Sequence, residues 1–304
     1  MKRRKSGFTI VELLTVIGIM AMLVALLIPA VTAVKNTAKH TKQKAQFVGI
    51  DMALTAFRND YGDYPPSNWW DPPPAPTGPR NYCGAQKLAE ALVGWDLMGF
   101  HPKSDFRANG ANDAGLFVYN PNDAVLMAQR KGPYLELATA SVFRLGDLSP
   151  DKPGLFNGTG ELAADTFVLC DVFSVKKITF TKPGIFETTT QHAGTPILYY
   201  RANTSSKSLT YAAGPGGSSN PADLIYNARD NFPLINLGKL ADWNKPPAAR
   251  RRHILEDFNF FYEYIRDPKV TARPWPYRPD SYILISAGPD GEYGTADDIC
   301  NFGN

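Results

Sequence analysis

The sequence predicts an α+β protein in which one long N-terminal helix precedes a head of short strands and loops. Residues 8–34 form an apolar run with the length of a membrane-spanning helix. Apolar side chains then recur at intervals of three and four residues over 47–61, which indicates one buried face of a continuing helix. Farther along, residues 166–173, 195–202 and 282–286 are rich in β-branched and aromatic side chains and predict strands.

Length indicates a globular protein, and the distribution of charge argues against a nucleic-acid-binding one. The 304 residues, of which 44% are hydrophobic and 20% charged, are sufficient for a globular core. The formal net charge of +3 depends on four basic residues at positions 2–5, without which 28 basic residues face 29 acidic ones. A nucleic-acid-binding domain keeps a basic face in its folded part, so we expect no nucleic-acid partner.

The apolar run of residues 8–34 contains one ionisable side chain, that of Glu12. As a helix it is ~40 Å long, against ~30 Å for the hydrocarbon core of a bilayer. A secretory signal peptide has a shorter apolar stretch, although Val31-Thr32-Ala33 imitates its cleavage site. An ordinary membrane anchor leaves Glu12 unexplained, because a carboxylate near the bilayer centre costs ~2.5 kcal/mol or more.

The start of the chain resembles the class III leader of type IV pilins and type II secretion pseudopilins. The resemblance lies in the basic residues 2–5, the Gly7-Phe8 junction and the run FTIVELL from Phe8, which contains Glu12. It implies that a prepilin peptidase cuts after Gly7, that the new Phe8 amine is methylated, and that Glu12 is retained. Pro29 falls where pilins often carry a helix-bending proline.

The resemblance also gives Glu12 a role in assembly. In a filament of packed helices, the ammonium group of Phe8 can neutralise the Glu12 carboxylate of a neighbouring subunit. Because an unpaired buried carboxylate is heavily penalised, this pairing favours the correct register between subunits. The alternative is that Glu12 is protonated or turns toward the lipid headgroups.

The family resemblance implies four segments: a leader peptide 1–7, a transmembrane helix 8–34, its amphipathic continuation 35–64, and a periplasmic globular head 65–304. In the continuation the polar residues 35–46 precede an apolar face, and Gly62 and Pro65-Pro66 end the helix. Residues 57–66 resemble the helix exit of the protein G branch of pseudopilins. The resemblance implies that the helix packs on an antiparallel sheet, here with a large loop-rich insertion over about 100–235.

Within the head, residues 85–98 and 122–130 predict short helices, and 254–265 has helical spacing although its aromatic content leaves a strand possible. The proline-rich residues 67–80 predict an extended loop. Trp69 and Trp70 in it are either packed beneath the loop or exposed to a partner. The triple arginine at 250–252 predicts a solvated turn.

No catalytic motif emerges, and we expect a protein that is not an enzyme. The four histidines lie apart without metal-ligand spacing, and no nucleophile-elbow or phosphate-loop motif occurs. Cys83, Cys170 and Cys300 are also far apart and lack a CxxC pair. One disulfide with a free thiol and three free thiols both remain open.

The C-terminal segment contains the second motif that indicates a function. A predicted strand at 282–286 leads into a loop that contains Asp290, Asp297 and Asp298 among turn-forming glycines. The loop is neither an EF-hand nor a nonapeptide repeat. It resembles the calcium loop of protein G pseudopilins, which implies that the three aspartates bind Ca²⁺, with carbonyls near Ser286 and Gly294 as weaker candidates. The alternative is a hairpin whose carboxylates cap turn N–H groups.

Taken with the leader, these features predict a pseudopilin-like structural subunit of a type II secretion or type IV pilus-like filament. The resemblance implies prepilin peptidase and other pilin or pseudopilin subunits as partners. It also implies a single-pass position in the inner membrane with the C-terminal head in the periplasm. The alternative is a membrane-anchored extracytoplasmic binding protein that shares the leader but does not assemble.

Overall fold

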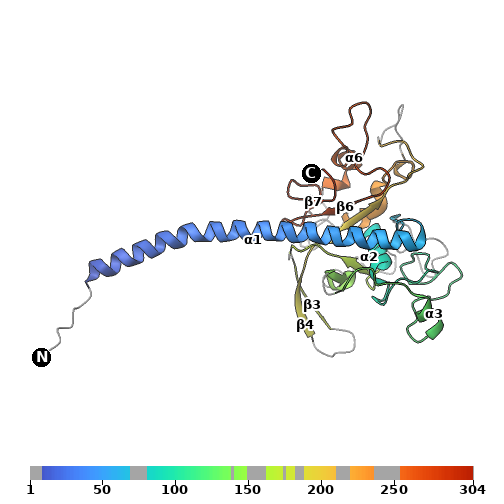
Figure 1. Ribbon diagram of the computed structural model, residues 1–304, viewed down its shortest axis with the longest axis horizontal. Coiled ribbons are helices and arrows are strands. Elements are labelled where there is room, and N and C mark those ends of the chain that lie inside the picture. The colour runs from blue at the N-terminus through green and yellow to red at the C-terminus, as the bar shows by residue number, and fades with distance from the viewer. Residues whose placement is uncertain are drawn as a thin grey trace, which may run out of the picture. The chain divides into compact units, whose positions relative to one another are not determined.

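The computed structural model describes residues 9–303, apart from 69–80, 138–139, 149–161, 174–175, 182–187, 210–219 and 236–253. The fold is α+β, with one long helix and small antiparallel sheets (Figure 1). The chain divides into two compact units, Met1–Lys42 and Gln43–Asn304. The predicted arginine turn at 250–252 and almost all of the predicted proline-rich loop, with Trp69 and Trp70, lie outside the described residues.

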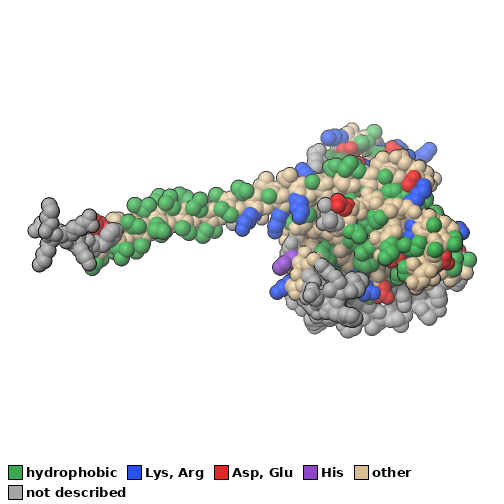
Figure 2. All heavy atoms as spheres, turned by 60° about the horizontal axis from the view of Figure 1, so that its bottom comes forward, with side chains coloured by type: hydrophobic (Ala, Val, Ile, Leu, Met, Phe, Trp, Pro, Cys, Tyr) green, Lys and Arg blue, Asp and Glu red, His purple; other side chains and the backbone are tan. Residues whose placement is uncertain are grey.

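The first unit contains the N-terminal part of helix α1, Ile10–Tyr61. The large apolar side chains of its stretch 10–34 are exposed along the helix, and Figure 2 shows them as a green rod. Pro29 lies inside α1 without ending it. In the described part of the chain, α1 is the one helix that is long and apolar enough to cross a membrane.

The second unit begins with the C-terminal part of α1. The predicted apolar face is confirmed, since Phe47, Ile50, Leu54 and Phe57 are buried. The helix ends at Tyr61, and Gly62 follows with a φ of +86°, a conformation that glycine adopts at little cost.

A three-stranded antiparallel sheet lies at the centre of this unit, in the order β5-β6-β7. Its strands are β5 (Leu198–Arg201), β6 (Tyr282–Ser286) and β7 (Ile299–Cys300), and in the register Tyr199 lies opposite Leu284. The predicted strand 282–286 is confirmed in full, whereas β5 is shorter than the predicted 195–202.

The two faces of this sheet are buried in different apolar clusters. Tyr199 and Leu284 belong to the cluster that contains the α1 side chains and helix α2 (Gly84–Val93). Tyr200 and Ile285 belong to the other cluster, with Phe261 of helix α6 (Phe258–Tyr264). Because successive side chains of a strand point to opposite faces, helices cover the sheet on both sides.

Helix α2 approaches the sheet closely at its first residue. A Cβ atom on Gly84 would lie 2.3 Å from the carbonyl oxygen of Tyr199, so a larger residue does not fit there. The helix is shorter than predicted because Gly94, with a φ of +92°, follows Val93. The predicted helix at 254–265 is confirmed as the 3₁₀ turn η6 (Ile254–Glu256) followed by α6.

The remaining elements are short. Two antiparallel pairs join β1 (Val142–Arg144) to β2 (Phe167–Leu169) and β3 (Lys176–Thr181) to β4 (Thr188–Ala193). The other helical segments among the described residues are α3 (Ala124–Gln129), α4 (Leu145–Leu148), η2 (Pro221–Asp223), η3 (Ala228–Asn231) and α5 (Phe232–Ile235). The helix predicted at 122–130 is confirmed by α3.

Candidate functional site

The processing and assembly region begins at the start of α1. Gly7 and Phe8, which flank the predicted cleavage point, lie outside the described residues. Glu12 lies in the first turn of α1 and is exposed. Its side chain is engaged within its own helix. The Thr9 backbone N–H donates to Glu12 Oε2 at 2.8 Å, and the Thr9 hydroxyl donates to the same oxygen at 2.7 Å.

Thr9 and Glu12 form a reciprocal capping box. The backbone N–H of Glu12 donates to Thr9 Oγ1 at 3.2 Å, which completes the exchange. Such a box satisfies donors that the first turn of a helix leaves without intrahelical partners. The spacing T-x-x-E at 9–12 is the sequence signal for this motif, so the role of Thr9 was predictable although we did not predict it.

Two glutamines fix α1 to the rest of the second unit. Gln43 is fully buried and its Oε1 accepts a hydrogen bond from the Val172 N–H at 3.0 Å. Gln46 Nε2 donates to the carbonyl oxygens of Cys170 at 2.9 Å and Ala140 at 3.3 Å. Polar residues at these positions resemble an ordinary solvated face, so sequence reasoning alone missed the contacts.

A second anchor lies farther along α1, at Asp51. Its carboxylate accepts a hydrogen bond from the Tyr282 hydroxyl and pairs with Arg278 at 3.3 Å. Arg278 has a φ of +49°. The Tyr226 hydroxyl donates to its carbonyl oxygen at 2.5 Å. These contacts hold the entrance of β6 against α1.

The C-terminal loop brings two of its three aspartates together. The backbone N–H of Asp290 donates to Asp297 Oδ2 at 3.2 Å. The Thr295 hydroxyl donates to Asp297 Oδ1 at 2.5 Å. Burial and the neighbouring Asp297 charge raise the pKa of Asp290. Gly288 permits the close turn, because a Cβ there would lie 2.2 Å from the Asp297 carbonyl oxygen.

Asp298 is turned toward the body of the head. Its Oδ2 accepts hydrogen bonds from the Tyr264 hydroxyl at 2.6 Å and the Gly294 N–H at 2.7 Å. Burial raises the pKa of this carboxyl to about 6, against the lowering effect of both donors. The partner Tyr264 lies on α6, 34 residues away, so the loop sequence gave no sign of it.

The arrangement of the loop matches a hydrogen-bonded turn. The carboxylate oxygens of the loop accept hydrogen bonds from protein donors. Ser286, whose neighbourhood was to supply a weaker carbonyl ligand, donates its hydroxyl to Asp171 at 3.0 Å. Among the described residues, no group of three or more Asp, Glu, His or Cys side chains is placed to hold a metal ion. This arrangement does not test the calcium site expected from the sequence at Asp290, Asp297 and Asp298, and calcium binding stays a prediction.

A cavity of about 700 Å³ lies beside this loop. Its lining includes Tyr264, Tyr277, Asp298, Cys300 and Phe302. The Tyr264 hydroxyl lies 3.2 Å from Cys300 Sγ. Burial raises the pKa of the Cys300 thiol to about 12, so the thiol stays protonated and weakly nucleophilic at neutral pH.

The three cysteines carry free thiols. Cys83 and Cys170 are buried and Cys300 is partly exposed. Of the two alternatives that the sequence left open, the structure favours three free thiols.

Comparison with known proteins first gives the class of the N-terminal region. Residues 2–28 match the family model described as the prokaryotic N-terminal methylation motif. This match covers the basic leader, the Gly7-Phe8 junction, the Thr9–Glu12 capping box and most of the apolar stretch of α1.

The relatives narrow the class further. The chain is similar to the type II secretion system core protein G of Aeromonas hydrophila, with 33% identity over 86 residues, and of Dickeya chrysanthemi, with 31% over 87 residues. It is also similar to the same protein of Pseudomonas aeruginosa, with 36% identity over 64 residues. The motif and these relatives support the assignment of the chain to the type IV pilin and pseudopilin family.

The similarity covers part of each protein. It includes 27% of this chain for the first two relatives and 21% for the third. The matches span 60%, 57% and 45% of the relatives' own lengths, respectively. No solved structure matches the chain.

Proposed function

We propose that the protein is a pseudopilin-like structural subunit that a prepilin peptidase processes and that assembles with other pilin or pseudopilin subunits into a filament. The methylation motif is the observation that carries this proposal. It covers the start of an exposed apolar helix, and the first turn of that helix contains a single acid, Glu12. In this account the head lies in the periplasm and α1 anchors it in the inner membrane.

The exposed apolar stretch of α1 supports a helix that first faces lipid and then other helices. All of its large side chains between Ile10 and Val34 are more than 45% exposed. Such a surface is stable in a bilayer or against similar helices, and it is unstable in water. The same surface therefore serves both the membrane anchor and the packed core of a filament.

The Thr9–Glu12 box supports a specific assembly step. In the isolated chain, two Thr9 donors satisfy Glu12 Oε2. Cleavage after Gly7 would create a charged amine at Phe8, one residue before Thr9. A neighbouring Phe8 ammonium offers Glu12 a stronger, charge-assisted partner than the Thr9 hydroxyl. We infer that assembly exchanges the internal contact for this intersubunit pair.

The distribution of the chain between filament and membrane tests the proposal. Cells that overproduce the full chain are sheared, and the sheared fraction and the membranes are probed for the head. Recovery of the processed chain along filaments is the expected result. Recovery solely as dispersed membrane monomers would favour an anchored binding protein that does not assemble, for which the cavity beside Tyr264 is the candidate ligand site.

A further inference from the structure

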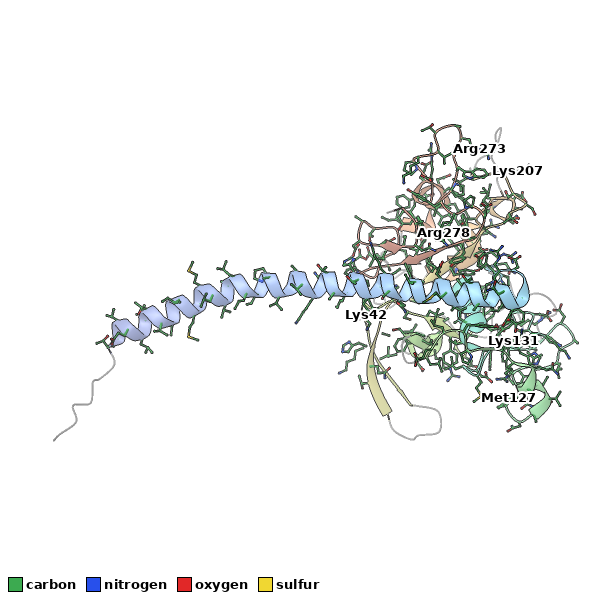
Figure 3. All side chains as sticks on the ribbon, in the orientation of Figure 1. Lys42, Met127, Lys131, Lys207, Arg273 and Arg278 are labelled. Atoms are coloured by element: carbon green, nitrogen blue, oxygen red, sulfur yellow. The ribbon has the colours of Figure 1, made fainter. Side chains whose placement is uncertain are left out.

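The part of α1 that follows the apolar stretch carries three of its four lysines on one side. Lys35, Lys39 and Lys42 are exposed and are separated by four and three residues, which places them on one face of the helix. We call these three residues the lysine stripe. Figure 2 shows blue side chains following the green apolar rod, and Figure 3 labels Lys42 on α1.

The charges of the lysine stripe are not neutralised along the chain. The sequence contains no acidic residue between Glu12 and Asp51, so no helical neighbour can form an ion pair with the stripe. In the described residues, the ion pairs of the protein involve other basic side chains. Three exposed ammonium groups within eight residues therefore attract an external anion.

The position of the stripe follows from the length of the apolar stretch. Residues 10–34 extend ~37 Å as a helix, which exceeds the ~30 Å hydrocarbon core. A helix of excess apolar length tilts so that its apolar side chains stay in lipid. Lys35 then lies at the edge of the hydrocarbon, and Lys42, ~10 Å farther along the helix, lies within or just beyond the headgroup layer.

We propose that the lysine stripe binds the headgroups of anionic phospholipids in the leaflet from which α1 emerges. A tilted helix leans one face over the headgroups, and a one-sided row of lysines matches that geometry. Lysine side chains bury their methylene stems beside apolar surface while the ammonium group reaches the phosphates. The proposal rests on α1 spanning the bilayer, and it is independent of filament assembly.

Binding of this kind has a structural consequence. The stripe selects the direction in which α1 tilts, because the face that carries the three lysines turns toward the membrane surface. Neutralising the stripe removes both the lipid preference and this constraint on rotation about the helix axis. Lys44, two residues beyond Lys42, falls on the other side of the helix by its spacing and provides a matched control.

The experiment measures lipid selectivity around the full-length chain. The protein is reconstituted in phosphatidylcholine vesicles with a trace of spin-labelled phosphatidylglycerol or spin-labelled phosphatidylcholine. Electron paramagnetic resonance gives the fraction of each label that the protein immobilises. We expect the wild type to favour the anionic label at least ~5-fold at low salt, the effect of one lysine at a membrane surface.

Three controls separate the stripe from general charge. The variant with Lys35→Gln, Lys39→Gln and Lys42→Gln should lose the preference, as should the wild type in 1 M salt, where charges are screened within ~3 Å. Lys44→Gln should keep it. A variant with the same charge change on the head, Lys103→Gln, Lys207→Gln and Lys269→Gln, should also keep it. Circular dichroism and vesicle flotation confirm that each variant is folded and inserted.

Two results would overturn the proposal. One is equal immobilisation of both labels by the wild type. The other is an unchanged lipid preference in the triple stripe variant, accompanied or not by a loss of chemical cross-linking between copies in purely zwitterionic vesicles. A loss of cross-linking with unchanged lipid selectivity would show that acidic protein surfaces bind the stripe.

Discussion

The side-chain amide of Gln46 donates to the carbonyl oxygen of Cys170 at 2.9 Å and so joins α1 to a residue 124 positions later. Cys170 directly follows strand β2 and forms an isolated bridge with Pro196, just before β5. One hydrogen bond thus connects the helix to the junction between two sheets. The contact fixes the register of α1 on the head in a way that apolar packing alone does not.

Gln46→Ala should therefore destabilise the head. The substitution leaves the carbonyl oxygens of Cys170 and Ala140 without this donor, and a lost partner of a buried polar group costs about 1–3 kcal/mol. Thermal unfolding of the full chain in detergent should show a lower midpoint. Lys44→Ala, an exposed change on the same helix, serves as the control and should leave the midpoint nearly unchanged. Equal midpoints for wild type and Gln46→Ala would refute the anchoring role.

The parts of the fold that local patterns determine were predictable. The spacing of Phe47, Ile50, Leu54 and Phe57 gave the buried face of α1, and the β-branched residues of 282–286 gave β6. Strand β4, with the sequence TTTQHA, was missed because it has no apolar alternation, and its pairing with β3 is what defines it.

The candidate sites were predictable to a similar extent. The leader, Glu12 and the turn glycines of the last loop could be identified because their signals are local. The partners of Asp298 and Gln46 could not, since Tyr264 and Cys170 lie far away in the sequence. The contact between Asp230 and Ser67 spans 163 positions and depends on the completed fold in the same way.

Replacement of Glu12 tests the assembly step. Glu12→Ala should leave cleavage after Gly7 and head folding intact, because Glu12 makes its side-chain contacts within the first turn of α1. It should lower incorporation into filaments by about tenfold or more, the equivalent of ~1.4 kcal/mol. Glu12→Asp should lower it less. Quantitative immunoblots of sheared filaments measure the effect, with Thr37→Ala as a control on the same helix. Normal incorporation of the alanine variant would contradict the pairing of Glu12 with Phe8.

The stability of the head should fall as pH rises from about 4 to 7. Burial raises the pKa of Asp171 and of Asp230 to about 7, although the Ser67 hydroxyl and the Lys87 charge act against the shift at Asp230. The native state keeps these protons at a pH where the unfolded chain has released them, so the stabilisation is complete at low pH and is lost through neutrality.

Asp230→Asn isolates one of these two groups. The amide has no titrating proton and can still accept the Ser67 hydrogen bond, so the variant should lose stability less steeply between pH 4 and 7. The stability of the variant relative to that of the wild type should be highest at pH 8. Urea unfolding at several pH values measures the slope, and Asp280→Asn, an exposed acid, is the control. Parallel profiles for Asp230→Asn and wild type would rule out the assignment.

Calcium should stabilise the chain if the last loop binds it through Asp290, Asp297 and Asp298. At 100 times its dissociation constant, a ligand that binds the native state alone adds ~2.7 kcal/mol. The full chain should then melt at a higher temperature in millimolar Ca²⁺ than in chelator, and equal Mg²⁺ should have a smaller effect. Asp297→Ala should abolish the difference between the two buffers. Equal melting in both buffers, with no bound calcium by elemental analysis, would leave the loop as the hydrogen-bonded turn described above.

The mass of the mature protein tests the central claim most directly. Intact mass spectrometry of the chain extracted from membranes should show the loss of residues 1–7 and one added methyl group, with Phe8 as the N-terminal residue. A mature N-terminus at Val34, after Ala33, would instead establish an ordinary secretory signal peptide, and retention of Met1 to Gly7 would establish a plain membrane anchor. Either result would contradict the proposal that this chain is processed and assembled as a pseudopilin.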